Sequence, residues 1–365
     1  MTDLLPARIT PADEIVTAEI LPAEIVTRPV HSAADFAVSA AAREAVLAGI
    51  PASTRRAYAA DWSAFTAWCA EHGRVSLPVT AETVTEYVTH LTVTPSAKTG
   101  RPLAPSSIER ALAAIRTMHN AADEAPPQTK AARKVLSGYR ERLALSKDPA
   151  SRTRKADPAV PDALRMMLAT LDRSTLAGKR DAALLLLGYA CAARVSELAA
   201  LDIADVKDTP DGLLVSVYRR KIKAFTETAV PYGKIPETCP VRAVRDLLAA
   251  MAEAGRTSGP LLVRIDRHGR IAPPLTRGGK QIGDPSGRMT ADAIADVVSR
   301  IAEAAGLEGR WTGHSLRRGF ATAARRAGAA LERIGRHGGW ADGSKALLGY
   351  LEEGDRWTDN PVTGL

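Results

Sequence analysis

The sequence predicts a mainly α-helical protein with a small antiparallel β-sheet in its second half. Alanine is abundant while aromatic residues make up only 4% of the 365 residues, and alanine is the residue that most favours helix. After residue 50, apolar residues recur at helical spacing along most of the chain. Only residues 213–218 and 228–230 have the character of strands, and a polar turn separates them.

The first third of the chain divides into a tail and a helical unit. Residues 1–35 are expected to form a flexible N-terminal tail, because prolines interrupt them repeatedly. Residues 36–145 are expected to form a helical domain. Its first long helix should be capped by Ser53 or Thr54 and run toward Gly73. Its further helices are expected over 81–91, from a capping box at Ser106–Glu109 onward, and over 128–143.

A linker and a second domain follow. Residues 146–161 are basic and carry several prolines, which predicts an exposed linker rather than a buried connection. Residues 162–355 are expected to form the second domain, and residues 356–365 a C-terminal tail. The helices expected in the second domain lie over 162–171, 178–192, 241–254, 290–305, 315–327, 330–335 and 343–351.

The charge of the chain indicates a polyanionic partner. The formal net charge is +8 and the sequence pI is about 9.5, and nucleic acid is the commonest partner of such a protein. Any single basic residue is more typical of a solvated helix face. As a group, the bases of the helical domain and linker are expected to follow DNA phosphates: Arg110, Arg116, Lys130, Arg133, Lys134, Arg140, Arg152, Arg154 and Lys155.

Several classes of protein are disfavoured. The three cysteines, Cys69, Cys191 and Cys239, are far apart and form no CxxC pair, so neither a disulfide framework nor a cysteine-rich zinc site is expected. No metal and no other cofactor is expected, because Asp, Glu and His do not cluster near the candidate arginines. No apolar run reaches membrane-spanning length, and no signal pattern is present, which together favour a bacterial-type cytoplasm.

Four short segments carry the candidate chemistry. Arg194-Val-Ser-Glu197-Leu follows an apolar helix, and His314-Ser-Leu-Arg317 opens a later one with both side chains on one face. Gly338-Gly339-Trp340 and then Tyr350 come next. Each alone is more typical of a structural residue: a capping arginine, a core tryptophan, a half-buried tyrosine. Together and in this order, they suit an attack on a phosphodiester, since arginines neutralise phosphate and tyrosine is a nucleophile.

With the basic strand pair between them, these segments resemble the tyrosine recombinase, or phage integrase, family over about residues 45–355. The resemblance implies a two-domain DNA clamp, with a helical core-binding domain and a catalytic domain. It implies a site-specific recombinase that cuts and rejoins DNA through a 3′-phosphotyrosine, without metal or ATP. The implied partners are two double-stranded DNA sites. The implied assembly is a homotetramer on DNA and a monomer or weak oligomer in isolation.

The resemblance also implies residue roles. Arg194 and Arg317 would clamp the non-bridging oxygens of the scissile phosphate, a task suited to planar guanidiniums. Tyr350 would attack phosphorus. His314 would hydrogen-bond the phosphate or help to move the tyrosine proton. Glu197 would support the site by orienting Arg194 or the histidine.

Two positions stay open at this point. The general acid for the leaving 5′-oxygen would be a lysine on the turn of the small sheet, and Lys223 is favoured over Lys221. Trp340 would donate its indole N–H to a phosphate oxygen. The gap from Trp340 to Tyr350 is one residue longer than is usual in the family, which a turn at 342–344 could absorb. If it does not, His337 could reach the phosphate instead.

Two other functions compete with recombination. A DNA-binding protein of the same fold without catalysis would not need Arg194, His314, Arg317 and Tyr350 together. A type IB topoisomerase would share the phosphotyrosine chemistry but relax supercoils without a paired site. The separate basic helical domain favours the recombinase.

Overall fold

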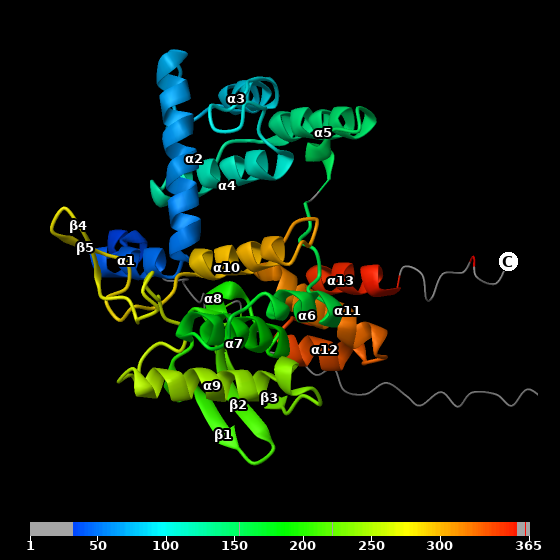
Figure 1. The fold of residues 1–365 in the computed structure, drawn as a ribbon. Coiled ribbons are helices and arrows are strands. Elements are labelled where there is room, and N and C mark those ends of the chain that lie inside the picture. The colour runs from blue at the N-terminus through cyan, green and yellow to red at the C-terminus, as the bar shows by residue number, and fades with distance from the viewer. Residues whose placement is uncertain (1–31, 153, 221, 356–361, 363–365) are drawn as a thin grey trace, which may run out of the picture. The chain divides into compact units, whose positions relative to one another are not determined.

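The computed structural model describes residues 32–152, 154–220, 222–355 and 362, and the chain divides into two compact units, 1–153 and 154–365 (Figure 1). Each unit has a hydrophobic core of its own. The predicted N-terminal and C-terminal tails fall largely outside the described residues, as does Lys221. The architecture is mainly helical with small antiparallel sheets, which confirms the predicted fold class.

Over its described residues, 32–152, the first unit is built from helices alone. Its core joins Phe65, Val84, Ile108 and Leu136, one from each of four helices, and all four are almost fully buried. The apolar residues that recur at helical spacing in the sequence are the ones that meet here. The helices are α1 (Ala40–Ala48), α2 (Ala52–Glu71), α3 (Ala81–Val93), α4 (Pro105–Ala121) and α5 (Lys130–Leu145).

Two predicted helix starts in this unit are wrong. Pro51 is the N-cap of α2, so Ser53 and Thr54 lie inside its first turn and do not cap it. Ala104 is the N-cap of α4 and Pro105 occupies its first position, ahead of the capping box expected at Ser106–Glu109. Proline fits this position because its fixed φ suits the helix and the N–H that it lacks would have no partner inside the helix.

The second unit surrounds a central helix, α7, with further helices and a three-stranded sheet. The sheet has the order β1-β2-β3 and is antiparallel throughout, with Val215 opposite Thr228 in the register of β2 and β3. A separate hairpin joins β4 (Leu275–Arg277) to β5 (Lys280–Ile282). The other elements are α6 (Pro161–Ala169), α7 (Leu176–Ala190), α8 (Val195–Leu198), β1 (Val206–Thr209), β2 (Gly212–Arg219), β3 (Ala224–Pro231), α9 (Pro240–Glu253), α10 (Ala291–Ala304), α11 (Gly313–Arg326), α12 (Leu331–Gly338) and α13 (Lys345–Asp355).

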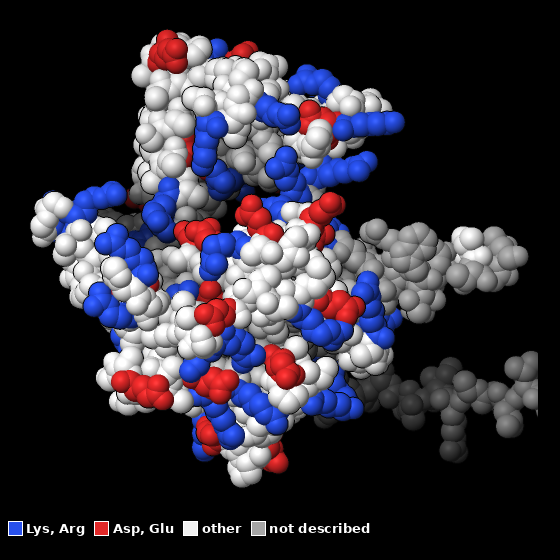
Figure 2. All heavy atoms as spheres, in the orientation of Figure 1, with Lys and Arg blue, Asp and Glu red and all other residues white. Residues whose placement is uncertain are grey.

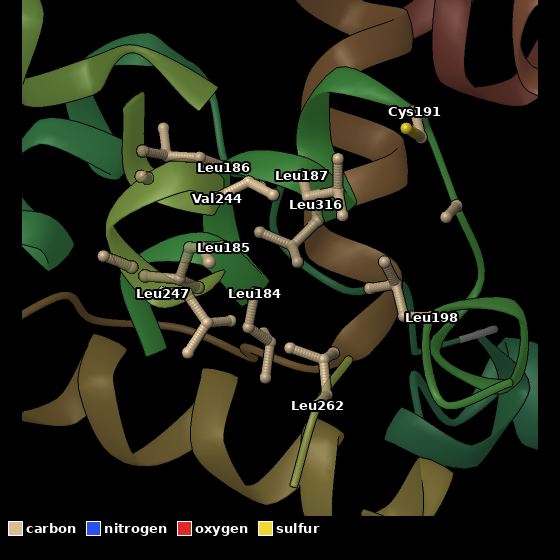
Figure 3. Packing of buried hydrophobic residues seen from close by; sticks show 14 of the residues in the cluster. Leu184, Leu185, Leu186, Leu187, Cys191, Leu198, Val244, Leu247, Leu262 and Leu316 are labelled. Atoms are coloured by element: carbon tan, nitrogen blue, oxygen red, sulfur yellow. The ribbon is translucent and has the colours of Figure 1, made fainter. Parts of the chain in front are cut away.

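The leucine run of α7 holds this unit together. Leu184–Leu187 are buried on every side of the helix, against Leu247 of α9 and Leu316 of α11 (Figure 3). Burying one such side chain contributes about 1.5–3 kcal/mol. α7 ends at Ala190, and the turn that follows includes Ala192 at a φ of +45°. The chain leaves the core at this turn and presents Arg194.

The predicted linker is exposed only in part. The backbone N–H of Asp157 donates to the carbonyl of Arg310 at 2.8 Å, and that of Ala159 donates to the carbonyl of Ser315 at 2.9 Å. Ala159 is fully buried. The expectation of an exposed connection is therefore wrong for residues 156–159, because their backbone is bound to the start of α11.

Candidate active site

Arg194 and Glu197 come from the turn after α7 and from the short helix α8. Arg194 is the N-cap of α8, and its backbone N–H donates to Glu197 Oε2 at 2.9 Å. Its guanidinium Nη1 donates to Glu197 Oε1 at 2.6 Å. The carboxylate is fully buried while the arginine side chain keeps 21% of its surface exposed. Glu197 therefore holds the Arg194 guanidinium in place while part of the arginine side chain remains exposed to solvent.

Arg219, which was not among the residues predicted for the site, binds the same carboxylate. It is fully buried at the end of β2, and its Nη1 donates to Glu197 Oε2 at 3.0 Å. Its Nη2 donates to the carbonyls of Cys191 at 3.1 Å and His337 at 3.0 Å. The signal was present in the sequence: alternation along β2 puts Leu213, Val215, Val217 and Arg219 on the same buried face.

The carboxylate of Glu197 is ionised in this setting. Burial alone raises its pKa, but the hydrogen bonds from Arg194 and the charges of Arg194 and Arg219 outweigh burial and hold the pKa below its usual value. Two guanidiniums thus share one negative charge. The cluster keeps an excess of positive charge, which suits an anion.

His314 and Arg317 are carried by α11. Thr312 caps this helix, with its Oγ1 accepting from the His314 backbone N–H at 3.2 Å. The two side chains lie one turn apart, as their spacing predicted. His314 is exposed at the helix start, whereas Arg317 is 2% exposed. The histidine therefore stands at the surface and the arginine below it.

The guanidinium of Arg317 is bound through one terminal nitrogen, while the other has no partner in the described part of the chain. Its Nη1 donates to the carbonyls of Ala192 and, at 2.6 Å, Gly338. Its central carbon lies 3.6 Å from the centre of the Trp340 ring, a cation–π contact. Its Nη2 is buried and has no hydrogen-bond partner among the described residues. An orphaned buried donor is costly, and an anionic oxygen would satisfy it.

The electrostatics of Arg317 point the same way. Burial, followed by the charge of Arg194, lowers the pKa of Arg317 to about 9, against the opposing effect of Glu197. The guanidinium remains charged at neutral pH. A phosphate placed against it would relieve the cost of holding that charge in a buried, positively charged setting.

The imidazole of His314 is kept neutral. Partial burial, followed by the positive charge of three arginines, lowers its pKa below the ordinary value of 6.5. These are Arg317, Arg194 and Arg310. The fold brings the distant sequence segments of Arg194 and Arg317 together, because α11 packs directly on α8: a Cβ on Gly313 would lie 1.8 Å from Val195 Cγ1.

Trp340 and Tyr350 complete the group. Gly343 adopts a φ of +67° in a turn between α12 and α13, and Ser344 N–H donates to the Ala341 carbonyl at 3.1 Å. The predicted turn at 342–344 is therefore present. It brings the Trp340 and Tyr350 rings to 6.3 Å in an edge-to-face arrangement. Besides Arg317 and Tyr350, the indole ring packs in a small buried cluster with Ala192, Ile334 and Leu347.

Tyr350 also contacts Arg318, an arginine that was not predicted as part of the site. Arg318 follows Arg317 on α11 and is 3% exposed. Its guanidinium lies 5.6 Å from the centre of the Tyr350 ring, and its Nη1 donates to the carbonyl of Ala156. The tyrosine is half-buried. Arg318 thus links the segment before α6 to the tyrosine ring.

His337 is engaged away from this group. Its Nε2 lies 2.6 Å from the carbonyl oxygen of Ala190, and its ring stacks on Phe320 at 4.5 Å. Burial lowers its pKa, while the hydrogen bond to Ala190 acts in the opposite direction. Trp340 lies against Arg317, whereas the His337 side chain packs against Ala190 of α7 and Phe320 of α11.

Lys223 and the bases predicted to bind DNA lie on the surface. Lys223 is exposed on the β2–β3 turn at a φ of +53°. Figure 2 shows Lys and Arg side chains spread over both units. Arg110 forms an ion pair with Asp61 at 2.7 Å, and Arg140 one with Glu109 at 2.7 Å. The other predicted DNA-binding residues, all exposed, are Arg116, Lys130, Arg133, Lys134, Arg152, Arg154 and Lys155.

The comparisons with known proteins agree with this geometry. The family model described as the phage integrase family matches residues 160–354. An integrase/recombinase xerD homolog of Selenomonas ruminantium is 30% identical over 322 residues, 85% of this chain and 84% of that protein. The recombinase cre of Escherichia phage P1 is 24% identical over 304 residues, 80% and 82% of the two chains.

A solved structure shows the same fold. The crystal structure of a lambda integrase (75–356) dimer bound to a COC′ core site matches with a TM-score of 0.54 and 13% identity, over 87% of this chain and 95% of that one. The chain belongs to the phage integrase family, the tyrosine site-specific recombinases. The predicted family and recombinase function are confirmed.

Proposed function

We propose that this recombinase cuts and rejoins duplex DNA with Tyr350 as its nucleophile. The observation that carries the proposal is the buried, unpartnered Nη2 of Arg317, in a positively charged cluster beside Tyr350. An anionic oxygen bound there would lie among Arg194, His314 and Arg317. The DNA partner is inferred from this phosphate-binding character and from the basic charge of the chain.

The proposed reaction is a transesterification. The hydroxyl oxygen of Tyr350 attacks phosphorus, the P–O5′ bond breaks, and a 3′-phosphotyrosine and a 5′-hydroxyl result. The phenolic proton passes to the neutral ring of His314, and Lys223 protonates the leaving oxygen. Arg194 and Arg317 stabilise the charge on the non-bridging oxygens. Attack by a 5′-hydroxyl from another strand reverses these steps and exchanges strands.

The assembly follows from this chemistry. Exchange between two duplex sites requires cleavage of four strands, and each copy carries one Tyr350. We therefore propose a homotetramer on DNA, with two copies on each duplex.

Covalent trapping tests the nucleophile. Wild-type protein is incubated with nicked duplexes from the DNA that flanks its gene, and a protein–DNA adduct that survives SDS is expected. Tyr350→Phe should form no adduct and should bind the duplex as wild type does. Tyr232→Phe, which alters an exposed tyrosine after β3, is the matched control and should form the adduct. An adduct in Tyr350→Phe would overturn the assignment.

A substituted substrate tests the general acid. Lys223→Ala should cleave ordinary DNA poorly. It should recover on DNA whose scissile 5′-oxygen is replaced by sulfur, because a thiolate leaves without protonation. The same pair of substrates applied to Lys221→Ala decides between the two lysines. Supercoil relaxation without joining of paired sites would instead favour a topoisomerase.

A further inference from the structure

The β4–β5 hairpin is an exposed two-stranded ribbon with a glycine turn. Its register pairs Arg277 with Lys280 and Leu275 with Ile282. The two residues between the strands, Gly278 and Gly279, have φ values of +56° and +75°, and a type I′ turn requires positive φ at both. A Cβ on either glycine would meet no atom within 4 Å. The glycines therefore serve the backbone turn, which aligns the two strands.

At the tip of this ribbon, two cationic side chains occupy directly opposite positions on the two strands. Arg277 and Lys280 are direct cross-strand neighbours, and like charges in that position destabilise a hairpin. Both are exposed, and neither has an acidic partner among the residues that the structure describes. An anion that bound both would remove the repulsion. The tip therefore has the features of an anion-binding surface and is poorly explained as a structural turn.

The surrounding segment concentrates the charge of the chain. Residues 264–288 contain six Lys or Arg and two Asp, a net charge of +4, against +8 for all 365 residues. Of the other bases, Arg270 pairs with Asp266 at 3.3 Å and Arg264 Nη2 donates to the Asp284 carbonyl at 3.1 Å, while the exposed Arg267 donates through Nε to His268 Nε2 at 3.1 Å. Around the hairpin, Figure 2 shows mostly blue and white surface.

The base of the hairpin is attached beside the active site. Arg288 donates through Nη1 to the carbonyls of Ala199 at 2.9 Å and Leu201 at 3.2 Å, and through Nη2 to Asp202 at 2.5 Å. Ala199 is the C-cap of α8, the helix that carries Glu197 and is capped by Arg194. DNA that reaches Arg194 would therefore pass close to the segment from which the ribbon projects.

We propose that the β4–β5 hairpin is a DNA-contacting ribbon that binds phosphates flanking the scissile one. This proposal rests on the proposed function, because the duplex at the active site is what brings phosphates to the tip. A two-stranded ribbon fits a DNA groove. Leu275 and Ile282 lie on the same face as the two cations and are 43% and 41% exposed. They provide apolar contact to sugars beside the phosphate contacts.

Salt dependence of binding tests the ribbon. Full-length Arg277→Ala/Lys280→Ala is compared with wild type by fluorescence anisotropy on a blunt duplex of mixed sequence, over a series of KCl concentrations. Loss of two phosphate contacts should reduce the slope of log K against log salt by about 1.8. Lys207→Ala/Lys234→Ala removes two other exposed cations of the same unit and should leave the slope unchanged. The charge-keeping Arg277→Lys/Lys280→Arg should retain the wild-type slope.

The outcomes separate this proposal from the proposed function. An unchanged slope in the alanine pair overturns the ribbon. A change in the mass of the protein in solution, with an unchanged slope, also overturns it and identifies the hairpin as a contact between copies. The covalent adduct of wild-type protein reports on the function alone. Its presence together with an unchanged slope means that the recombinase assignment stands and the ribbon fails.

Discussion

Replacing Glu197 tests whether one carboxylate holds the arginines of the site. In Glu197→Leu, Arg219 stays fully buried while its partner at 3.0 Å is lost. Removing one member of a buried ion pair costs about 3–5 kcal/mol, because the remaining charge has no compensation. The free energy of unfolding of the second unit should fall by that amount. For a unit of this size, the thermal midpoint should fall by roughly 6–20 °C.

The assay is differential scanning calorimetry of the full chain, in which the second unit is followed by its own transition. Asp208→Leu is the matched control, because it removes the partner of Arg245 from a pair whose side chains are 43% and 58% exposed. That change should cost less than about 1 kcal/mol. Glu197→Leu/Arg219→Met removes both charges. Its cost should fall short of the sum of the single costs by about 1–3 kcal/mol.

Two results would refute this reasoning. A midpoint for Glu197→Leu close to that of Asp208→Leu would mean that the buried pair contributes little. Strict additivity of the two single changes would mean that Glu197 and Arg219 act independently. In either case, the ion pair with Glu197 would not be what stabilises Arg219 in the core.

Three further predictions concern His314, Gly338 at the end of α12, and Arg318. The folded state holds the pKa of His314 below 6.5, so it binds fewer protons than the unfolded state does. The free energy of unfolding should therefore fall as the pH drops below about 6.5. Urea unfolding should show a smaller fall in His314→Gln. Gly338→Ala should lower the free energy of unfolding by about 1–3 kcal/mol and remove most of the adduct yield, because its Cβ would lie 1.8 Å from the indole ring of Trp340. Gly335→Ala is the control and should change both little, because the nearest contact of its Cβ would be at 3.6 Å. Arg318→Met should slow adduct formation about 2- to 30-fold with unchanged DNA binding, since a cation–π contact of about 0.5–2 kcal/mol to Tyr350 is lost.

The parts of the fold that the sequence predicted are those set by local pattern. Helices with a regular apolar stripe, such as α3 with Val84 and Val88, were found within a few residues of their bounds. The spacing of His314 and Arg317 placed both on one helix face for the same reason. Tyr350 became the candidate nucleophile because of the order of several segments, and its surroundings could not be predicted from residues 343–351 alone.

The missed features depend on contacts between distant segments. Arg219 begins the basic run that ends at Lys223, and such a run is typical of a solvated turn. The alternation of side chains along β2 nevertheless places Arg219 on the buried face of the strand. The β4–β5 hairpin was missed although two glycines between short polar and apolar runs are a hairpin signal. The burial of Ala156 and Ala159 depends on hydrogen bonds to Arg318 and Ser315 of α11, which no local pattern indicates.

The arrangement also explains how a cluster of buried arginines is stable before a phosphate arrives. The last carbonyls of a helix have no partner inside the helix and carry partial negative charge. Arg219 and Arg317 donate to such carbonyls after α7, at Cys191 and Ala192, and at the end of α12, at His337 and Gly338. Each guanidinium therefore joins two helix ends, which an ammonium with one nitrogen would do less well. Because these contacts use only part of the Arg317 guanidinium, the fold can be complete while one buried donor remains for the substrate.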